Sequence, residues 1–172
     1  MKFTPAPLAG VFLIEPEYIE DERGFFARTW CAEQFEQHGL NPKLVQCNVS
    51  FNRRAGMHYE TPPHAEAKLV RCTMGSLYDV VIDLRPESAT FREWFGAELT
   101  SENRRMLYAP EGFAHGFETL LDNTEVFYQM SESFHPECAA SVGWDDPTFG
   151  IQWPISPTVI SEKDRQIKRV AA

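Results

Sequence analysis

Short apolar segments separated by turn residues dominate the chain and predict a fold built from strands. These segments are rich in aromatic and β-branched residues, which favour extended structure. Met74-Gly75 and Asp122-Asn123 are typical of hairpin turns between such strands. Strands are expected at residues 11–14, 24–30, 44–50, 68–73, 76–84, 94–99, 106–108, 116–120 and 124–131. Strands at this spacing favour a jelly roll or barrel over alternating strands and helices.

Two segments break this pattern and predict short helices. Residues 32–38 precede Gly39, a residue that commonly ends a helix. Ser161 and Asp164 have the spacing of a capping box, which predicts a short C-terminal helix starting at Ser161. No repeat, low-complexity tract or linker interrupts residues 1–172, so we expect a single domain.

Charge and cysteine content narrow the class of protein. A net charge of −9 argues against a general nucleic-acid binder but allows a small anionic ligand held by a few local cations. The N-terminal residues contain no apolar run long enough for a signal peptide or a membrane span. The cysteines are widely spaced and form no Cys-x-x-Cys pair, which argues against structural zinc. We therefore expect a cytoplasmic protein with reduced thiols.

The most informative motif runs from Pro110 to Phe117 and has the form Pro-x-Gly-x-x-His. Pro110 and Gly112 predict a tight turn, after which the chain enters a strand that carries His115. This places an imidazole at a barrel wall, where it can face an enclosed pocket. The motif resembles the second signature of the cupins, which are small β-barrels around a small-molecule site.

The densest set of potential metal ligands is His58, Glu60, His64, Glu66 and His115. His58 and Glu60 are two residues apart, so on a strand they share one face. Histidine and carboxylate ligands suit iron, manganese or zinc. A metal-dependent enzyme that uses His58, Glu60, His64 and His115 is therefore one hypothesis.

The same region also suits acid–base chemistry without a metal. His58 is a candidate general base, Tyr128 a candidate acid, and Lys68 a cation for a developing enolate. Asp164 is a candidate partner that orients His58. Each residue has a simpler interpretation: Tyr128 as a core-edge aromatic, Lys68 as a solvated strand residue, and Asp164 as the helix-capping acid.

Taken together, the motifs resemble the dTDP-4-dehydrorhamnose 3,5-epimerase family, which are cupins. The resemblance covers nearly the whole chain in order, through residues 21–26, 45–50, 56–59, 65–71, 78–85, 101–105, 110–117, 144–147 and 161–164. It implies a cupin jelly-roll barrel that uses neither metal nor cofactor. It also implies a homodimer.

The resemblance implies that the enzyme inverts C3, C5 or both in a nucleotide-linked 4-keto-6-deoxy sugar. His58 removes a proton with the help of Asp164, Lys68 stabilises the enolate at O4, and Tyr128 donates a proton from the opposite face. The implied substrate-binding residues are Arg23, Gln46, Asn48, Arg54, His115, Phe134 and Lys163, with Arg23 at the diphosphate and Phe134 stacked on the base.

The chain departs from the family pattern at three places. About four residues that usually precede the catalytic histidine are missing before Met57, and Arg54 is the candidate to replace the arginine they carry. Glu60 stands where the family usually has glutamine, and Arg28 and Ala139 replace two acidic residues. These changes affect substrate binding, so both a working epimerase of altered specificity and a non-catalytic sugar-nucleotide-binding relative remain open.

Overall fold

The computed structural model describes residues 1–52, 56–60, 65–155 and 167, and at residues 52 and 56–60 it describes the backbone alone. These residues form thirteen strands and one helix. In chain order the elements are β1 (Lys2–Pro5), β2 (Phe12–Glu15), β3 (Tyr18–Asp21), β4 (Gly24–Ala27), α1 (Ala32–Gln37), β5 (Gln46–Asn52), β6 (Gly56–Glu60), β7 (Lys68–Met74), β8 (Ser76–Asp83), β9 (Trp94–Thr100), β10 (Met106–Ala109), β11 (Phe113–Thr119), β12 (Thr124–Met130) and β13 (Ala139–Ala140).

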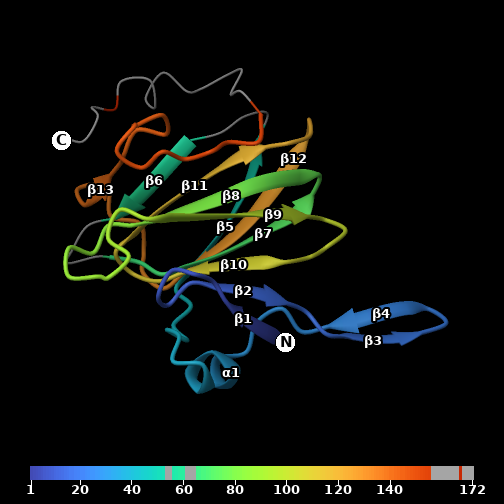
Figure 1. Ribbon diagram of the computed structural model, residues 1–172. Helices are drawn as coiled ribbons and strands as arrows, with labels where there is room; N and C mark the ends of the chain where they lie inside the picture. The colour runs from blue at the N-terminus through green and yellow to red at the C-terminus, as the bar shows by residue number, and fades with distance from the viewer. Residues whose placement is uncertain (53–55, 61–64, 156–166, 168–172) are drawn as a thin grey trace.

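Two antiparallel sheets face each other in a jelly roll (Figure 1). The larger sheet has the order β1-β2-β10-β7-β12-β5, and the smaller has the order β13-β6-β11-β8-β9. Val70 and Val126 from the larger sheet meet Val81 and Phe113 from the smaller in one buried cluster. The predicted mainly-β barrel is confirmed, and its interior lies between these two sheets.

The outer face of each sheet is covered as well. Helix α1 packs on the larger sheet through Phe35, which joins a buried cluster with Leu69 and Tyr108. The segment after β13 covers the smaller sheet, where Val142 and Phe149 pack against strands β8 and β11. Burying both faces of the sheets explains why strands β8, β10 and β11 are buried along most of their length rather than at alternating positions.

The hairpin of β3 and β4 projects away from the barrel in Figure 1. The sequence predicted a strand at 24–30, but the strand ends at Ala27 and pairs with β3, which was not predicted. Both strands are almost entirely exposed, including Ile19 at 71% and Phe26 at 65%. This hairpin packs on no core, so no buried apolar pattern marks the residues of β3. A prediction based on buried apolar positions therefore misses this strand.

The turn before His115 is tightly held. Gly112 has a φ of +84°, and a Cβ added there would lie 2.6 Å from Cγ of Arg85. The guanidinium of Arg85 lies 4.5 Å from the ring centroid of Phe113. Strand β11 therefore starts at Phe113, three residues before the predicted start at 116, and His115 lies inside it.

Other boundaries agree with the prediction within a few residues, including α1 before Gly39 and the hairpin turn at Gly75. Strands β1, β6 and β13 were not among the predicted strands. The C-terminal helix predicted from Ser161 falls outside the described residues. Within those residues, no helix has the length and apolar character needed to cross a membrane.

Candidate active site

His115 lies at the wall of the barrel interior, as its motif predicted. It is 8% exposed, and its Nε2 lies 2.6 Å from Oδ1 of Asp79 on β8. A carboxylate accepts hydrogen bonds, so the Nε2–H donates and the ring orientation is set by Asp79. Asp79 is fully buried, which makes this a charge-assisted contact shielded from water.

Strand β6 brings the position of His58 next to His115. The two strands pair antiparallel, and the Cα of His58 is the direct partner of the Cα of His115. Two histidine positions thus occupy adjacent strands at the same level of the smaller sheet. His58 and His115 are far apart in the sequence, so no local sequence pattern predicts that they pair.

Lys68 and Tyr128 stand on neighbouring strands of the larger sheet. Nζ of Lys68 lies 2.6 Å from Oε1 of Glu66, and the two side chains are 12% and 4% exposed. This burial excludes the interpretation of Lys68 as a solvated strand residue. Tyr128 is half-buried against the core, and burial raises the pKa of its phenol while the negative charge of Glu66 raises it further.

Three predicted binding residues are joined in one polar group at the end of the larger sheet. The backbone N–H of Phe134 donates to Oε1 of Gln46 at 3.1 Å. Nε2 of Gln46 donates to Oδ1 of Asn48, also at 3.1 Å. The ring of Phe134 is 54% exposed, so its face is open to a planar group. This arrangement suits a base or sugar resting beside Tyr128, whose Cα partner is Asn48.

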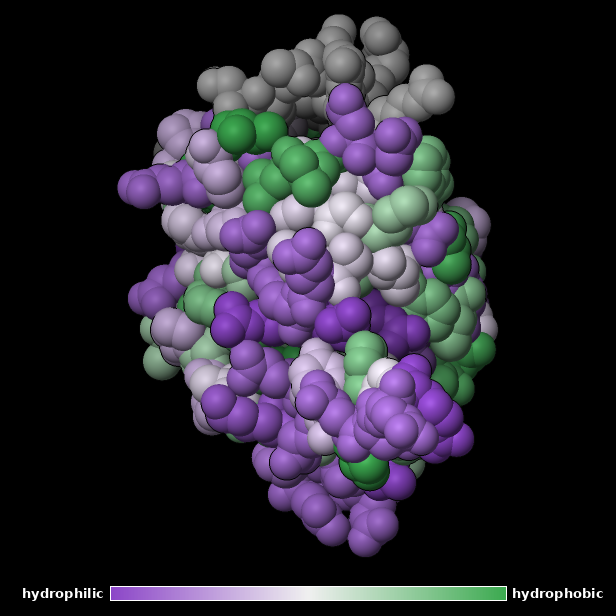
Figure 2. Space-filling model, turned by 90° about the vertical axis from the view of Figure 1, so that its right-hand side faces the viewer, coloured by the Kyte–Doolittle hydropathy of each residue, from purple (hydrophilic) through white to green (hydrophobic). Residues whose placement is uncertain are grey.

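Arg23 does not join this group within the chain. It lies in the exposed turn of the β3–β4 hairpin, and its guanidinium pairs with Asp21. Figure 2 looks onto the molecule from the side to which the hairpin projects, where hydrophilic residues cover most of the lower half. Arg23, the residue predicted to contact the diphosphate, is therefore separated from Lys68, Tyr128 and His115 within a single copy of the chain.

Several predicted residues lie outside the described residues: Arg54, His64, Lys163 and Asp164, together with the side chains of His58 and Glu60. Among the side chains that are described, no group of three or more His, Cys, Asp or Glu residues could hold a metal ion. Three members of the proposed metal set are outside that description. The metal hypothesis is thus not tested by this structure.

Sequence reasoning missed Asp79 as a functional candidate, although a signal existed. Asp79 is an acid between apolar residues of β8, and an acid in a mostly buried strand needs a buried partner. Glu66 was considered only as a metal ligand, whereas the structure pairs it with Lys68.

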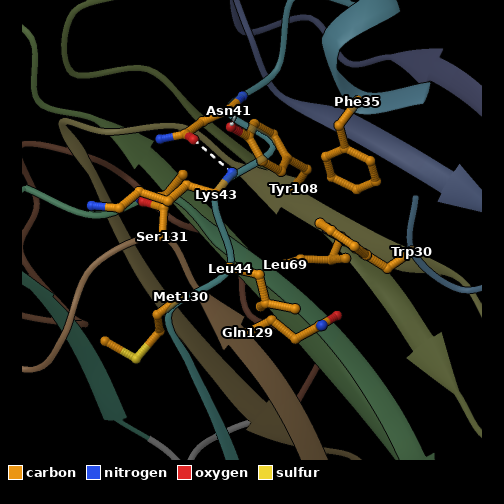
Figure 3. Close-up of a pocket in the computed structure, with 11 residues that line it drawn as sticks. Trp30, Phe35, Asn41, Lys43, Leu44, Leu69, Tyr108, Gln129, Met130 and Ser131 are labelled. Atoms are coloured by element: carbon orange, nitrogen blue, oxygen red, sulfur yellow. Dashed lines mark hydrogen bonds between the residues drawn. The ribbon is translucent and has the colours of Figure 1, made fainter. Parts of the chain in front are cut away.

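A separate pocket lies on the α1 side of the larger sheet (Figure 3). Trp30, Phe35 and Tyr108 line its apolar part, and a hydrogen bond from the backbone N–H of Lys43 to Asn41 closes one edge. It contains none of the predicted site residues. The residues suited to acid–base chemistry instead face the barrel interior from two sheets, where a cation and a phenol stand opposite an imidazole.

Comparisons with known proteins find relatives over nearly the whole chain. The model of the family described as dTDP-4-dehydrorhamnose 3,5-epimerase matches residues 5–172. The chain is 43% identical to the dTDP-4-dehydrorhamnose 3,5-epimerase of Methanothermobacter thermautotrophicus, over 97% of this chain and 93% of the relative.

Two solved structures are similar over almost the whole chain. The enzyme of that name from Elizabethkingia anophelis NUHP1 has a TM-score of 0.94 at 39% identity, covering 98% of this chain and 96% of the other. The dTDP-6-deoxy-D-glucose-3,5-epimerase of Legionella pneumophila Philadelphia 1, solved in complex with dTDP-4-keto-L-rhamnose, has a TM-score of 0.91 at 34% identity. That match covers 98% of this chain and 92% of the other.

Proposed function

Because this chain belongs to the dTDP-4-dehydrorhamnose 3,5-epimerase family, we propose that it is an isomerase that inverts C3, C5 or both in a nucleotide-linked 4-keto-6-deoxy sugar. The observation that carries the proposal is the placement of Lys68 and Tyr128 on one sheet of the barrel and of His115 on the facing sheet. A substrate between the sheets meets a cation, a phenol and an imidazole at once.

The proposed reaction proceeds through an enolate. The ketone at C4 acidifies the hydrogens on C3 and C5, and His58 removes one of them with Asp164 as its partner. The negative charge that develops on O4 is stabilised by the ammonium of Lys68 in a site with little water. Tyr128 then donates a proton to the opposite face of the carbon, which inverts the centre.

We assign substrate binding to a second group of residues. Gln46, Asn48 and Phe134 hold the nucleotide or sugar at the end of the larger sheet, and the exposed ring of Phe134 stacks on the base. His115, oriented by Asp79, contacts the sugar. Arg54 and Lys163 are proposed as further substrate contacts by resemblance alone, and Arg23 is proposed to contact the diphosphate.

The position of Arg23 favours a homodimer in the proposal. The hairpin that carries it projects from the barrel and exposes Tyr18, Ile19, Phe25 and Phe26. Exposed apolar side chains on a projecting two-stranded arm are typical of a surface that is buried in an assembly. We therefore propose that the arm of one copy delivers Arg23 to the barrel of a second copy.

Incubation with dTDP-4-keto-6-deoxyglucose in D2O tests the activity. Proton abstraction and return from solvent place deuterium at each enolised carbon, so NMR or mass analysis of the sugar distinguishes C3, C5 and double inversion. We expect incorporation together with conversion to the epimer.

Two outcomes would overturn parts of the proposal. Tight binding of the nucleotide sugar without deuterium incorporation would identify a non-catalytic binding relative. Stoichiometric iron, manganese or zinc in the purified protein, with exchange lost on chelation, would replace the metal-free chemistry with the metal site at His58, Glu60, His64 and His115.

A further inference from the structure

Glu66 lies two residues before the start of β7 and has no role in the reaction described above. Its carboxylate is 4% exposed and lies 2.6 Å from Nζ of Lys68. Burying a carboxylate is costly unless its charge is used, and here it is committed to the same ammonium that faces the substrate. A buried anion beside the cation that stabilises an enolate needs an explanation.

The segment that carries Glu66 is fixed by the end of β12. The backbone N–H of Ala67 donates to Oγ of Ser131 at 2.8 Å, and the N–H of Ser131 donates to the carbonyl of Ala67 at 3.0 Å. These two bonds hold the residue next to Glu66 against the strand that bears Tyr128. The location of the carboxylate is therefore built into the fold rather than left to a flexible side chain.

We propose that Glu66 is a positioning residue of the epimerase reaction, which holds the Lys68 ammonium in place and supplies a negative charge to the part of the barrel that Lys68 and Tyr128 share on paired strands. The inference rests on the proposed function and extends it to a residue that contacts no substrate. The charge-assisted hydrogen bond uses one of the three N–H groups of Lys68 and leaves the others for O4. A long lysine side chain is thereby held in one conformation.

The negative charge has a second consequence at Tyr128. After the phenol gives its proton to the carbon, a tyrosinate remains on the strand next to β7, whose Lys68 holds the Glu66 carboxylate. Two like charges in a buried site repel each other, so the tyrosinate regains a proton from solvent more readily. Glu66 thus favours the protonated phenol that the next turnover requires.

Other charged or titratable groups line the same barrel interior, so the effect of Glu66 on Tyr128 must be separated from theirs. Strand β7 contributes Lys68 and Cys72, β8 contributes Asp79, and β11 contributes His115. His58 occupies the neighbouring strand position on β6. Asp79 is already committed to His115, and the second cause of the raised pKa at Tyr128, after burial, is Glu66.

Two substitutions separate the hydrogen bond from the charge. Glu66→Gln keeps an oxygen that accepts from Lys68 but removes the charge, whereas Glu66→Ala removes both. Glu118→Gln is the matched control, because Glu118 is a carboxylate 3% exposed on β11, on the alternate face from His115. Thermal unfolding of each variant establishes that it is folded.

The first measurement is the alkaline titration of Tyr128, followed by tyrosinate absorbance and isolated as the difference from the same protein carrying Tyr128→Phe. We expect Glu66→Gln to lower the pKa of Tyr128 by roughly half a unit to one unit. Glu118→Gln should leave it in place. An unchanged titration in Glu66→Gln, or an equal shift in the control, would overturn the proposed charge effect.

The second measurement is the steady-state reaction with its pH profile. Glu66→Gln should keep kcat near neutral pH within about threefold but lose activity at lower alkaline pH than the wild type, because the phenol must be protonated to donate. Glu66→Ala should lower kcat by about tenfold with little change in KM, because Lys68 is no longer held. Wild-type kcat in Glu66→Ala would overturn the positioning role.

The two measurements also distinguish failure of this inference from failure of the proposed function. The titration needs no substrate, so it tests the coupling between Glu66 and Tyr128 whether or not the protein is an epimerase. Absence of deuterium exchange in the wild type would reject the epimerase proposal and leave the titration result standing as an electrostatic property of the barrel.

Discussion

Lys68 and Tyr128 illustrate how the surroundings of a side chain determine its chemistry. Both residues lie on strands of the larger sheet, where a solvated lysine and an ordinary core-edge tyrosine were the simpler interpretations. The buried pair with Glu66 makes Lys68 part of the interior, and burial raises the pKa of Tyr128. At the scale of single residues, the roles proposed for Lys68 and Tyr128 therefore depend on the burial of their side chains more than on their residue types.

Tyr128→Phe tests whether the residue that returns a proton to the sugar differs from the residue that removes one. The first step does not need the phenol, so deuterium exchange should continue while formation of the inverted product falls by about 100-fold. NMR in D2O measures both on the same sample. His58→Ala should abolish both exchange and inversion.

Tyr78→Phe is the matched control for this prediction. Tyr78 is also partly buried, and burial raises its pKa, but it packs on the outer face of the smaller sheet with Trp153. Its substitution should leave exchange and inversion unchanged. Equal loss of exchange and inversion in Tyr128→Phe would show that the phenol is not the reprotonating acid.

At the scale of elements, the junction of β8 and β11 holds the turn before His115 in place. Asp83 at the end of β8 is fully buried, which works to raise the pKa of its carboxyl. Hydrogen bonds from Arg85, Ser88 and Thr90 outweigh this and hold the pKa well below its usual range. Arg85 in turn packs on Phe113 and over Gly112.

Asp83→Asn should lower the free energy of unfolding by about 2–3 kcal/mol at pH 7, because Arg85 loses its charged partner. A lowered carboxyl pKa stabilises the folded state above the unfolded-state pKa of about 4, and this contribution declines as pH falls toward the folded-state value. Urea unfolding should therefore show a difference between wild type and variant that shrinks below about pH 4.

Asp122→Asn provides the comparison, since Asp122 is an exposed turn residue. Its substitution should change the free energy of unfolding by less than about 0.5 kcal/mol at either pH. A difference between wild type and Asp83→Asn that stayed constant down to pH 3 would mean that the Asp83 charge is not what stabilises the junction.

Two departures from the family pattern prove to be neighbours in the sheet. Glu60 on β6 and Ala139 on β13 are direct Cα partners. Like charges directly opposite each other on antiparallel strands are unfavourable. With alanine at position 139, the acid at position 60 has no second acid directly opposite it in this pairing.

At the scale of the whole molecule, the proposed dimer predicts that Arg23 acts in the barrel of the partner copy. Arg23→Ala and His58→Ala should each be inactive alone. In an isolated heterodimer of the two variants, one site has both residues intact, so about half of the wild-type activity should return. Co-expression with two affinity tags followed by tandem purification supplies this heterodimer for assay.

A heterodimer carrying both substitutions on the same chain is the reference, because its other chain is wild type. If Arg23 acts in the partner's site, each site of this reference lacks one residue and both are inactive. Activity in the reference together with none in the mixed heterodimer would place Arg23 in the site of its own chain. A monomeric protein at assay concentrations would reject the dimer altogether.

Most strands and the β-class of the fold could be predicted from the sequence, because turn residues and apolar runs are local signals. The Pro-x-Gly-x-x-His motif likewise located a buried histidine at the barrel wall. The exposed strands β1 and β3 and the two-residue strand β13 escaped prediction, since little or no buried apolar pattern marks them. An acid inside an apolar strand signals that Asp79 needs a partner, but which residue pairs with it depends on how the strands are arranged. Glu66 is only two residues from Lys68, and its pairing was missed because burial of both side chains is not visible in the sequence.

The sequence by itself determined which chemical groups are available: an imidazole at a barrel wall, a lysine, a tyrosine, and a family pattern that runs the length of the chain. Only the tertiary structure decided which groups meet. Strand pairing set His58 beside His115, and two facing sheets enclosed Lys68, Glu66 and Tyr128. The reason is that charge strength and pKa depend on distance and burial, which arise only when segments far apart in the chain pack together.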